Sequence, residues 1–129
     1  MATRRLPEKQ LVDENVLPKL LTVCEKLWAH PDADPFKYPV HPEDAPGYFD
    51  IIKKPMDLST ARAKVEDGRT KTKEQFHKDI KQITQNTCTY NEHGSEIYFM
   101  GIRLEEASEK YIEEIFGESP SKEKRGRKR

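Results

Sequence analysis

A proline-rich segment between residues 31 and 55 limits the fold more than any other part of the chain. It holds six of the nine prolines. Because proline has a fixed φ angle and no backbone N–H, this density excludes a regular helix and a central strand. The segment still carries large apolar side chains that a solvated linker would not need: Phe36, Tyr38, Val40, Tyr48, Phe49, Ile51 and Ile52. We therefore predict a long ordered loop that packs on helices, with a short helical turn at 47–52 and a functional role.

The residues before this loop predict one amphipathic helix. Apolar side chains recur at the spacing of three and four that places them on one helical face: Leu17, Leu20, Leu21, Cys24, Leu27 and Trp28. Asn15 is the expected N-cap. Pro18 is tolerated because it falls in the first turn, where its missing N–H has no helical partner to lose.

Three further helices are predicted after the loop. The first, at 58–66, is capped by Asp57, ends at Gly68 and buries Leu58, Ala61 and Val65. The second, at 73–90, begins with a capping box in which Thr72 reaches Gln75, and its apolar face is Phe76, Ile80, Ile83, Thr87 and Tyr90. The third is capped by Ser95, ends at Gly117 and faces the core with Ile97, Gly101, Leu104, Ser108, Tyr111 and Ile115. Period-2 alternation is missing, so the predicted fold class is all-α.

Charge divides the chain into a body and a basic tail. The 23 basic and 23 acidic residues balance, but 122–129 carry six Lys or Arg against Glu123 alone. That segment is therefore +5 and the remainder is −5. We expect a flexible segment at 1–14, one domain at 15–117 and a disordered tail at 118–129. The tail fits a nuclear localisation signal, a contact with nucleic-acid phosphates, or a solvated end.

Several functional classes find no support in the sequence. It has no glycine-rich phosphate loop, no GxSxG and no HExxH, so no enzyme is predicted. No two of the four histidines are spaced i, i+4, so neither a metal nor a cofactor is expected. Cys24 and Cys88 lack a CxxC spacing and predict reduced thiols in an intracellular protein. No apolar run approaches the roughly 20 residues that span a bilayer.

Three ordered segments resemble the bromodomain family. The run from Ala45 to Leu58, APGYFDIIKKPMDL, resembles the second half of the family's ZA loop. Upstream, DPFKYPV at 34–40 resembles the WPF-shelf segment, and downstream NTCTYN at 86–91 resembles the end of helix αB with its Tyr-Asn pair. A lone Tyr-Asn pair carries no information, but three motifs in the right order and spacing are specific. The resemblance covers residues 15 to 117.

The resemblance implies a left-handed four-helix bundle with helices αZ, αA, αB and αC, a long ZA loop and a short BC loop. It also implies an acetyl-lysine pocket between the two loops. Asn91 would donate a hydrogen bond to the acetyl carbonyl, and Tyr48 would hold the same carbonyl through an ordered water. Four more residues would line the pocket: Phe36, Val40, Tyr90 and Ile97. Ile97 falls at the gatekeeper position just after the BC loop.

The chain departs from the family pattern at the expected pocket rim, which comprises Asp34, Pro35 and Ala45. Asp34 stands where the family has the shelf tryptophan, and Ala45 stands where many relatives have leucine. Both changes predict a more open and more acidic mouth. An acidic mouth suits a basic peptide, whereas the lost stacking area weakens the grip on hydrophobic ligands.

An amide side chain in an apolar pocket can discriminate between acetylated and unmodified lysine. An acetylated lysine is neutral and its carbonyl accepts a hydrogen bond, which the Asn91 amide can donate. An unmodified lysine brings an ammonium that only donates and would be buried without a partner. One hydrogen bond contributes about 0.5–1.5 kcal/mol, and each buried methylene about 0.8 kcal/mol. Because association costs offset several kcal/mol of this, a single mark should bind weakly.

The leading functional hypothesis is a nuclear, monomeric reader of acetylated histone tails, with no membrane partner. The alternative is a helical interaction domain whose pocket no longer binds acetyl-lysine. From spacing alone, Asn91 also fits a helix-end residue in left-handed geometry. Tyr48 and Tyr90 also fit core aromatics, and Ile97 also fits the core stripe of its helix.

Overall fold

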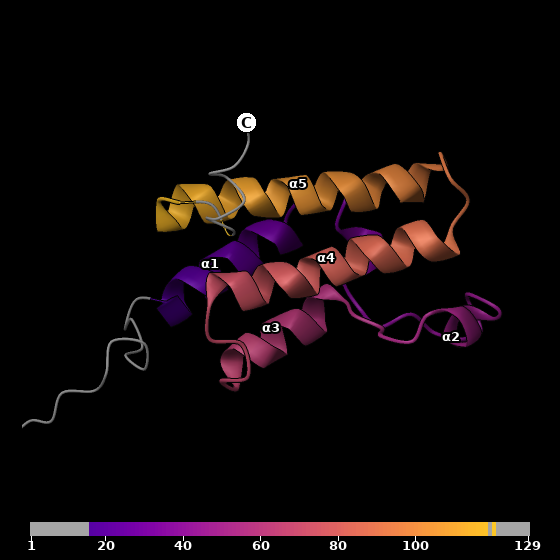
Figure 1. Ribbon diagram of the computed structural model, residues 1–129, viewed down its shortest axis with the longest axis horizontal. Helices are drawn as coiled ribbons and strands as arrows, with labels where there is room; N and C mark the ends of the chain where they lie inside the picture. Colours follow the sequence, from indigo (N-terminus) through magenta and orange to yellow (C-terminus); the bar gives the residue numbers. More distant parts are fainter. Residues whose placement is uncertain (1–15, 119, 121–129) are drawn as a thin grey trace, which may run out of the picture.

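The computed structural model describes residues 16–118 and 120, and the regular structure within them is entirely helical (Figure 1). The α-helices are α1 (Val16–Trp28), α2 (Tyr48–Ile51), α3 (Leu58–Glu66), α4 (Lys73–Tyr90) and α5 (Glu96–Phe116). A short 3-10 helix, η2, spans Asp34–Phe36. The predicted all-α class is confirmed. The expected Asn15 cap, the segment 1–14 and the basic residues of the tail lie outside the described residues.

Helices α1, α3, α4 and α5 form the predicted four-helix bundle, in the order expected for αZ, αA, αB and αC. Figure 1 shows α4 and α5 side by side along their length, with α1 and α3 packed beside them. The core combines one buried face from each helix, including Leu20 and Leu27 of α1, Val65 of α3, Phe76 of α4 and Leu104 of α5. In Figure 1, α2 and the connection between α4 and α5 lie at the same end of the bundle.

Two of the predicted helix starts have the expected caps. The Asp57 carboxylate accepts the Thr60 backbone N–H at 3.0 Å, and the Thr72 hydroxyl accepts the Gln75 N–H at 3.0 Å. The capping box differs in one detail, because the Gln75 side chain accepts the N–H of Lys71 at 2.7 Å. The Gln75 side chain therefore bonds to the residue before the N-cap and not to the N–H of Thr72 itself.

Some expected positions were wrong. Leu17 is 48% exposed because it lies in the first turn at the end of the bundle, where Val16 packs on the core instead. Ser95 is the N-cap of α5, yet its side chain makes no capping hydrogen bond. On α5, Ile112 is fully buried, whereas Tyr111 and Ile115 pack at the edge of the core.

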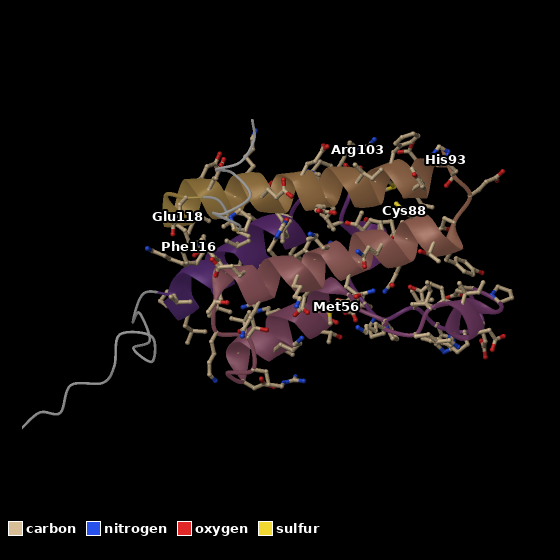
Figure 2. The ribbon with its side chains drawn as sticks, in the orientation of Figure 1. Met56, Cys88, His93, Arg103, Phe116 and Glu118 are labelled. Atoms are coloured by element: carbon tan, nitrogen blue, oxygen red, sulfur yellow. The ribbon has the colours of Figure 1, made fainter. Side chains whose placement is uncertain are left out.

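The long loop (residues 29–57) is held against the helices by specific contacts. The Arg103 guanidinium of α5, labelled in Figure 2, makes two hydrogen bonds to the Asp32 carboxylate, at 2.9 and 3.1 Å. This guanidinium lowers the pKa of Asp32. Further along, the Ser59 N–H of α3 donates to the Lys37 carbonyl at 3.0 Å. The loop is therefore ordered, as its apolar content predicts.

Cys24 and Cys88 are both free cysteines in the structure. Cys24 is buried in α1, and its burial raises the pKa of the thiol to about 12. Cys88 is half-buried near the end of α4, and its pKa is also raised by burial.

Among the described helices, none combines the length and the hydrophobicity needed to cross a bilayer.

Candidate functional site

A cavity opens at the end of the bundle where the long loop meets α4 and the start of α5. It contains about 370 Å³ of empty space, part of which is continuous with solvent. The long loop supplies most of its wall: Pro35, Phe36, Tyr38, Val40, Tyr48, Met56 and Asp57. The helical side is formed by Ile83, Thr87, Asn91 and Ile97. The wall is therefore mainly apolar, with a few polar groups at defined positions.

Asn91 is one of the polar residues that line the cavity. It is the C-cap of α4, and its φ of −91° and ψ of 156° are extended. The left-handed conformation considered from spacing is therefore wrong. Its side-chain Nδ2 donates to the Thr87 carbonyl at 3.0 Å, which fixes the amide plane. Since Nδ2 carries two hydrogens, one N–H remains for an acceptor in the cavity.

Tyr48 lies at the first position of α2 and is only 6% exposed. Its ring packs edge-on against Tyr90, with centroids 5.0 Å apart, and against Phe49, with centroids 5.2 Å apart. Burial raises the pKa of its phenol, and Tyr90 adds to that increase. The hydroxyl therefore keeps its proton at neutral pH and can both donate and accept a hydrogen bond.

Tyr90 does not line the cavity, although sequence reasoning placed it there. Its hydroxyl donates instead to the Pro46 carbonyl at 2.9 Å, and its ring supports Tyr48. Gly47, which follows Pro46 in the chain, has a φ of +74°, a conformation that glycine adopts without steric cost. Tyr90 therefore fastens the tip of the long loop to the end of α4.

The expected rim is only partly assembled at the cavity. Pro35 lines it, but Asp34 and Ala45 do not. Asp34 is directed to solvent, with 85% of its side chain exposed, and its carboxylate lies 2.9 Å from the Lys37 ammonium. Tyr38, which was not predicted as a site residue, lines the cavity and is 64% exposed.

Other lining residues were also missed, although the sequence held a signal for two of them. Ile83 and Thr87 precede Asn91 by eight and four residues on α4, so helical periodicity places all three on one face. Met56, labelled in Figure 2, and Asp57 lie where the loop enters α3. The Asp57 carboxylate caps that helix and also accepts the Thr60 hydroxyl at 2.6 Å. No short-range pattern would have placed these two residues at the cavity.

The long loop and the short loop (residues 91–95) together carry more acidic than basic side chains, and the basic ones are Lys37, Lys53 and Lys54 of the long loop. Residues 38–52 and 91–96 contain no Lys or Arg, and they carry five exposed carboxylates: Glu43, Asp44, Asp50, Glu92 and Glu96. Of these, Glu96 lies 3.2 Å from Arg103. A cationic ligand would therefore be attracted to this end of the bundle.

One cluster among the described residues has metal-ligand chemistry, and it lies elsewhere. Ligand atoms of His77, Glu105 and Glu109 lie within 4.8 Å of one another. His77 is about 20 Å from Asn91 along α4 at the ordinary helical rise. Its Nε2 lies 3.1 Å from a Glu109 oxygen, so the imidazole already has a partner.

Comparison with known sequences identifies the family. The sequence model of the Bromodomain family matches residues 20–101, which is more than half of the chain. The chain belongs to the bromodomain family. The long loop is therefore the ZA loop of a bromodomain, and the short loop (residues 91–95) is its BC loop.

Three relatives illustrate how this bromodomain chain compares with others. It is 45% identical over 75 residues to the SWR1 complex bromodomain subunit bdf1 of Schizosaccharomyces pombe, covering 57% of this chain and 13% of that protein. It is 36% identical over 86 residues to histone acetyltransferase GCN5 of Debaryomyces hansenii, covering 67% and 19%. It is 34% identical over 106 residues to bromodomain-containing factor 1 of Saccharomyces cerevisiae, covering 81% and 15%. The match spans less than a fifth of each of these relatives.

Proposed function

We propose that this bromodomain binds acetylated lysine on histone tails as a non-catalytic module, with Asn91 as the donor to the acetyl carbonyl. The observation that carries the proposal is the arrangement of the Asn91 amide. Its plane is fixed by the bond to Thr87, while its second N–H is left for a ligand in a mainly apolar cavity. A ligand that brings both an acceptor and an apolar stem fits this arrangement.

The same arrangement supports discrimination against unmodified lysine. An ammonium in the cavity would meet a donor N–H and apolar groups such as Val40 and Ile97. Asp57 also lines the cavity, but its carboxylate already accepts bonds from the first turn of α3. An ammonium would therefore lose hydration without gaining a free carboxylate, which is costly in a buried site.

Tyr48 is the proposed second polar contact. Its buried hydroxyl keeps its proton, so it can donate to a water molecule that in turn donates to the acetyl carbonyl. Phe36, Val40 and Ile97 contribute the apolar wall. Tyr90 contributes indirectly, because it holds Pro46 and Tyr48 in place.

The excess of acidic over basic side chains in the two loops supports a basic peptide as the partner. Histone tails are rich in Lys and Arg, so the exposed carboxylates of the two loops favour their approach. The names of the relatives refer to bromodomains and to a histone acetyltransferase, which agrees with this partner and with a nuclear location. The domain is proposed to act as a monomer, with the basic tail available for a weak contact to nucleic-acid phosphates.

The test is a calorimetric titration with one histone-tail peptide in acetylated and unmodified form. Native protein should bind the acetylated peptide weakly and prefer it by more than about tenfold. Asn91→Ala and the near-isosteric Asn91→Asp, which lacks the donor N–H, should each lose about 1–3 kcal/mol of binding free energy. Glu106→Gln, which alters an exposed carboxylate of α5 that does not line the cavity, should keep the affinity.

Two outcomes would overturn the proposal. If folded native protein binds neither peptide, the cavity no longer serves acetyl-lysine, as the alternative hypothesis holds. If native protein prefers the acetylated peptide but Asn91→Asp binds it equally well, the carbonyl donor is another group. Thermal unfolding of each variant shows whether the bundle itself is intact.

A further inference from the structure

Tyr38 lies at the mouth of the cavity with its ring largely uncovered. It belongs to the loop wall of the cavity, yet it is 64% exposed. By contrast, Phe36 and Tyr48 of the same wall are 6% exposed and form its inner part. An uncovered ring at the entrance leaves apolar surface in water that a bound ligand could cover.

The ring is held in place by a chain of contacts through Trp28. Tyr38 packs edge-on against Trp28, with ring centroids 5.4 Å apart and an interplanar angle of 89°. The Lys37 ammonium lies over the Trp28 ring, 5.1 Å from its centroid, and 2.9 Å from the Asp34 carboxylate. The residue that replaces the family's shelf tryptophan is therefore directed away from the cavity. Its contact with Lys37 helps to hold the Lys37 ammonium over the Trp28 ring, and Trp28 in turn packs against the ring of Tyr38.

We propose that Tyr38 is a specificity-determining wall that covers the aliphatic stem of the acetylated lysine where it leaves the cavity. This inference rests on the proposed function. If Asn91 takes the acetyl group inside the cavity, the four methylenes of the stem must pass the mouth, where Tyr38 stands. Tyr38 would thus supply apolar contact area that Asp34 cannot, and the Asp34–Lys37–Trp28 contacts position it.

A pair of ligands separates this role from a purely structural one. N-Methylacetamide carries the acetyl-amide group without the stem, so it reaches Asn91 and not Tyr38. An acetylated histone-tail peptide reaches both. Tyr38→Ala should therefore lower the affinity for the acetylated peptide by about three- to tenfold, which is the contribution of one or two methylene contacts with an aromatic ring. It should leave the affinity for N-methylacetamide, measured by NMR titration, unchanged.

Two control variants keep the experiment specific. Tyr38→Phe retains the ring and should bind the peptide within about twofold of native protein. Phe99→Ala removes another exposed aromatic residue, one that does not line the cavity, and should also leave the peptide affinity unchanged. If Tyr38→Ala lowers the affinity for both ligands equally, the ring only supports the fold of the site and the inference is wrong.

A measurement on native protein covers the case in which Tyr38→Ala fails to fold. In the complex with the acetylated peptide, nuclear Overhauser contacts should join the Tyr38 ring protons to the methylene protons of the acetylated lysine. Their absence in a formed complex would overturn the role of Tyr38 while leaving the proposed function standing. Failure of native protein to prefer the acetylated peptide would overturn both.

Discussion

The Asn86 side-chain amide donates a hydrogen bond to the Lys54 backbone carbonyl at 2.8 Å and so joins the long loop to α4. The Asn86 oxygen in turn accepts the Gln82 amide at 2.8 Å. Asn86 is 5% exposed, and it lies five residues before Asn91 on the same helix. This buried amide therefore helps to set the position of the loop relative to the helix that carries the proposed donor.

Removal of this buried amide should destabilise the domain. Asn86→Ala leaves the Lys54 carbonyl without this partner and opens a small cavity, so we expect a loss of about 1–3 kcal/mol in the free energy of unfolding. Urea denaturation followed by circular dichroism measures it. Gln85→Ala, which changes the exposed neighbour on α4, is the matched control. Equal stability of the two variants would show that the contact with Lys54 contributes nothing.

The hydroxyl of Tyr90 should contribute to both the stability of the domain and the binding of the peptide. Tyr90→Phe keeps the ring against Tyr48 but removes the bond to the Pro46 carbonyl, so the tip of the loop loses one anchor. Because the group is only half-buried, the loss in unfolding free energy should be about 0.5–1 kcal/mol. The acetylated peptide should bind a few-fold more weakly. Tyr111→Phe, remote from the cavity on α5, should change neither quantity by this amount.

His77 should make the domain sensitive to mild acid. Burial lowers the pKa of its imidazole below the ordinary value, and the carboxylates of Glu109 and Glu105 only partly oppose this, while Lys81 adds to it. As the pH falls below about 6.5, the unfolded chain takes up the proton before the folded one does. The stability that the neutral imidazole contributes at neutral pH is therefore lost on acidification.

The check is the unfolding free energy of native protein and His77→Gln between pH 7.5 and 5. The native value should fall over this range, and the variant should fall less. His93→Gln, an exposed histidine of the short loop, should follow the native profile. Parallel profiles for native protein and His77→Gln would mean that the imidazole does not titrate differently in the folded state.

Much of the fold follows from local sequence signals. Periodicity and caps predicted helices α3 and α4 with the bounds found. Asp57 and Thr72 each accept a backbone N–H in the first turn of their own helix, and this local bond does not depend on the tertiary packing. The long loop was predicted to be ordered because its prolines exclude regular structure while its apolar side chains require burial. The exposed position of Leu17 was not predictable, since burial at a helix end depends on how far the neighbouring helices extend.

The candidate site was predictable in part, and the reason differs from residue to residue. Asn91, Tyr48, Val40, Phe36 and Ile97 were singled out from a family resemblance, and the fold brings all five to one cavity. Tyr90 and Asp34 were assigned to the site by motif position, but their side chains point to Pro46 and Lys37. Tyr38 was missed because its position depends on packing against Trp28, a contact between the loop and a helix that no local pattern encodes.

The most direct test of the central claim is the NMR signal of the Asn91 side-chain amide. In ¹⁵N-labelled protein, one of its two N–H resonances should shift saturably when the acetylated peptide is added. The other N–H, which donates to the Thr87 carbonyl, should show a much smaller shift. The unmodified peptide should shift neither resonance. If both peptides shift the amide alike, or if the acetylated peptide binds without moving it, Asn91 is not the donor that recognises the acetyl group.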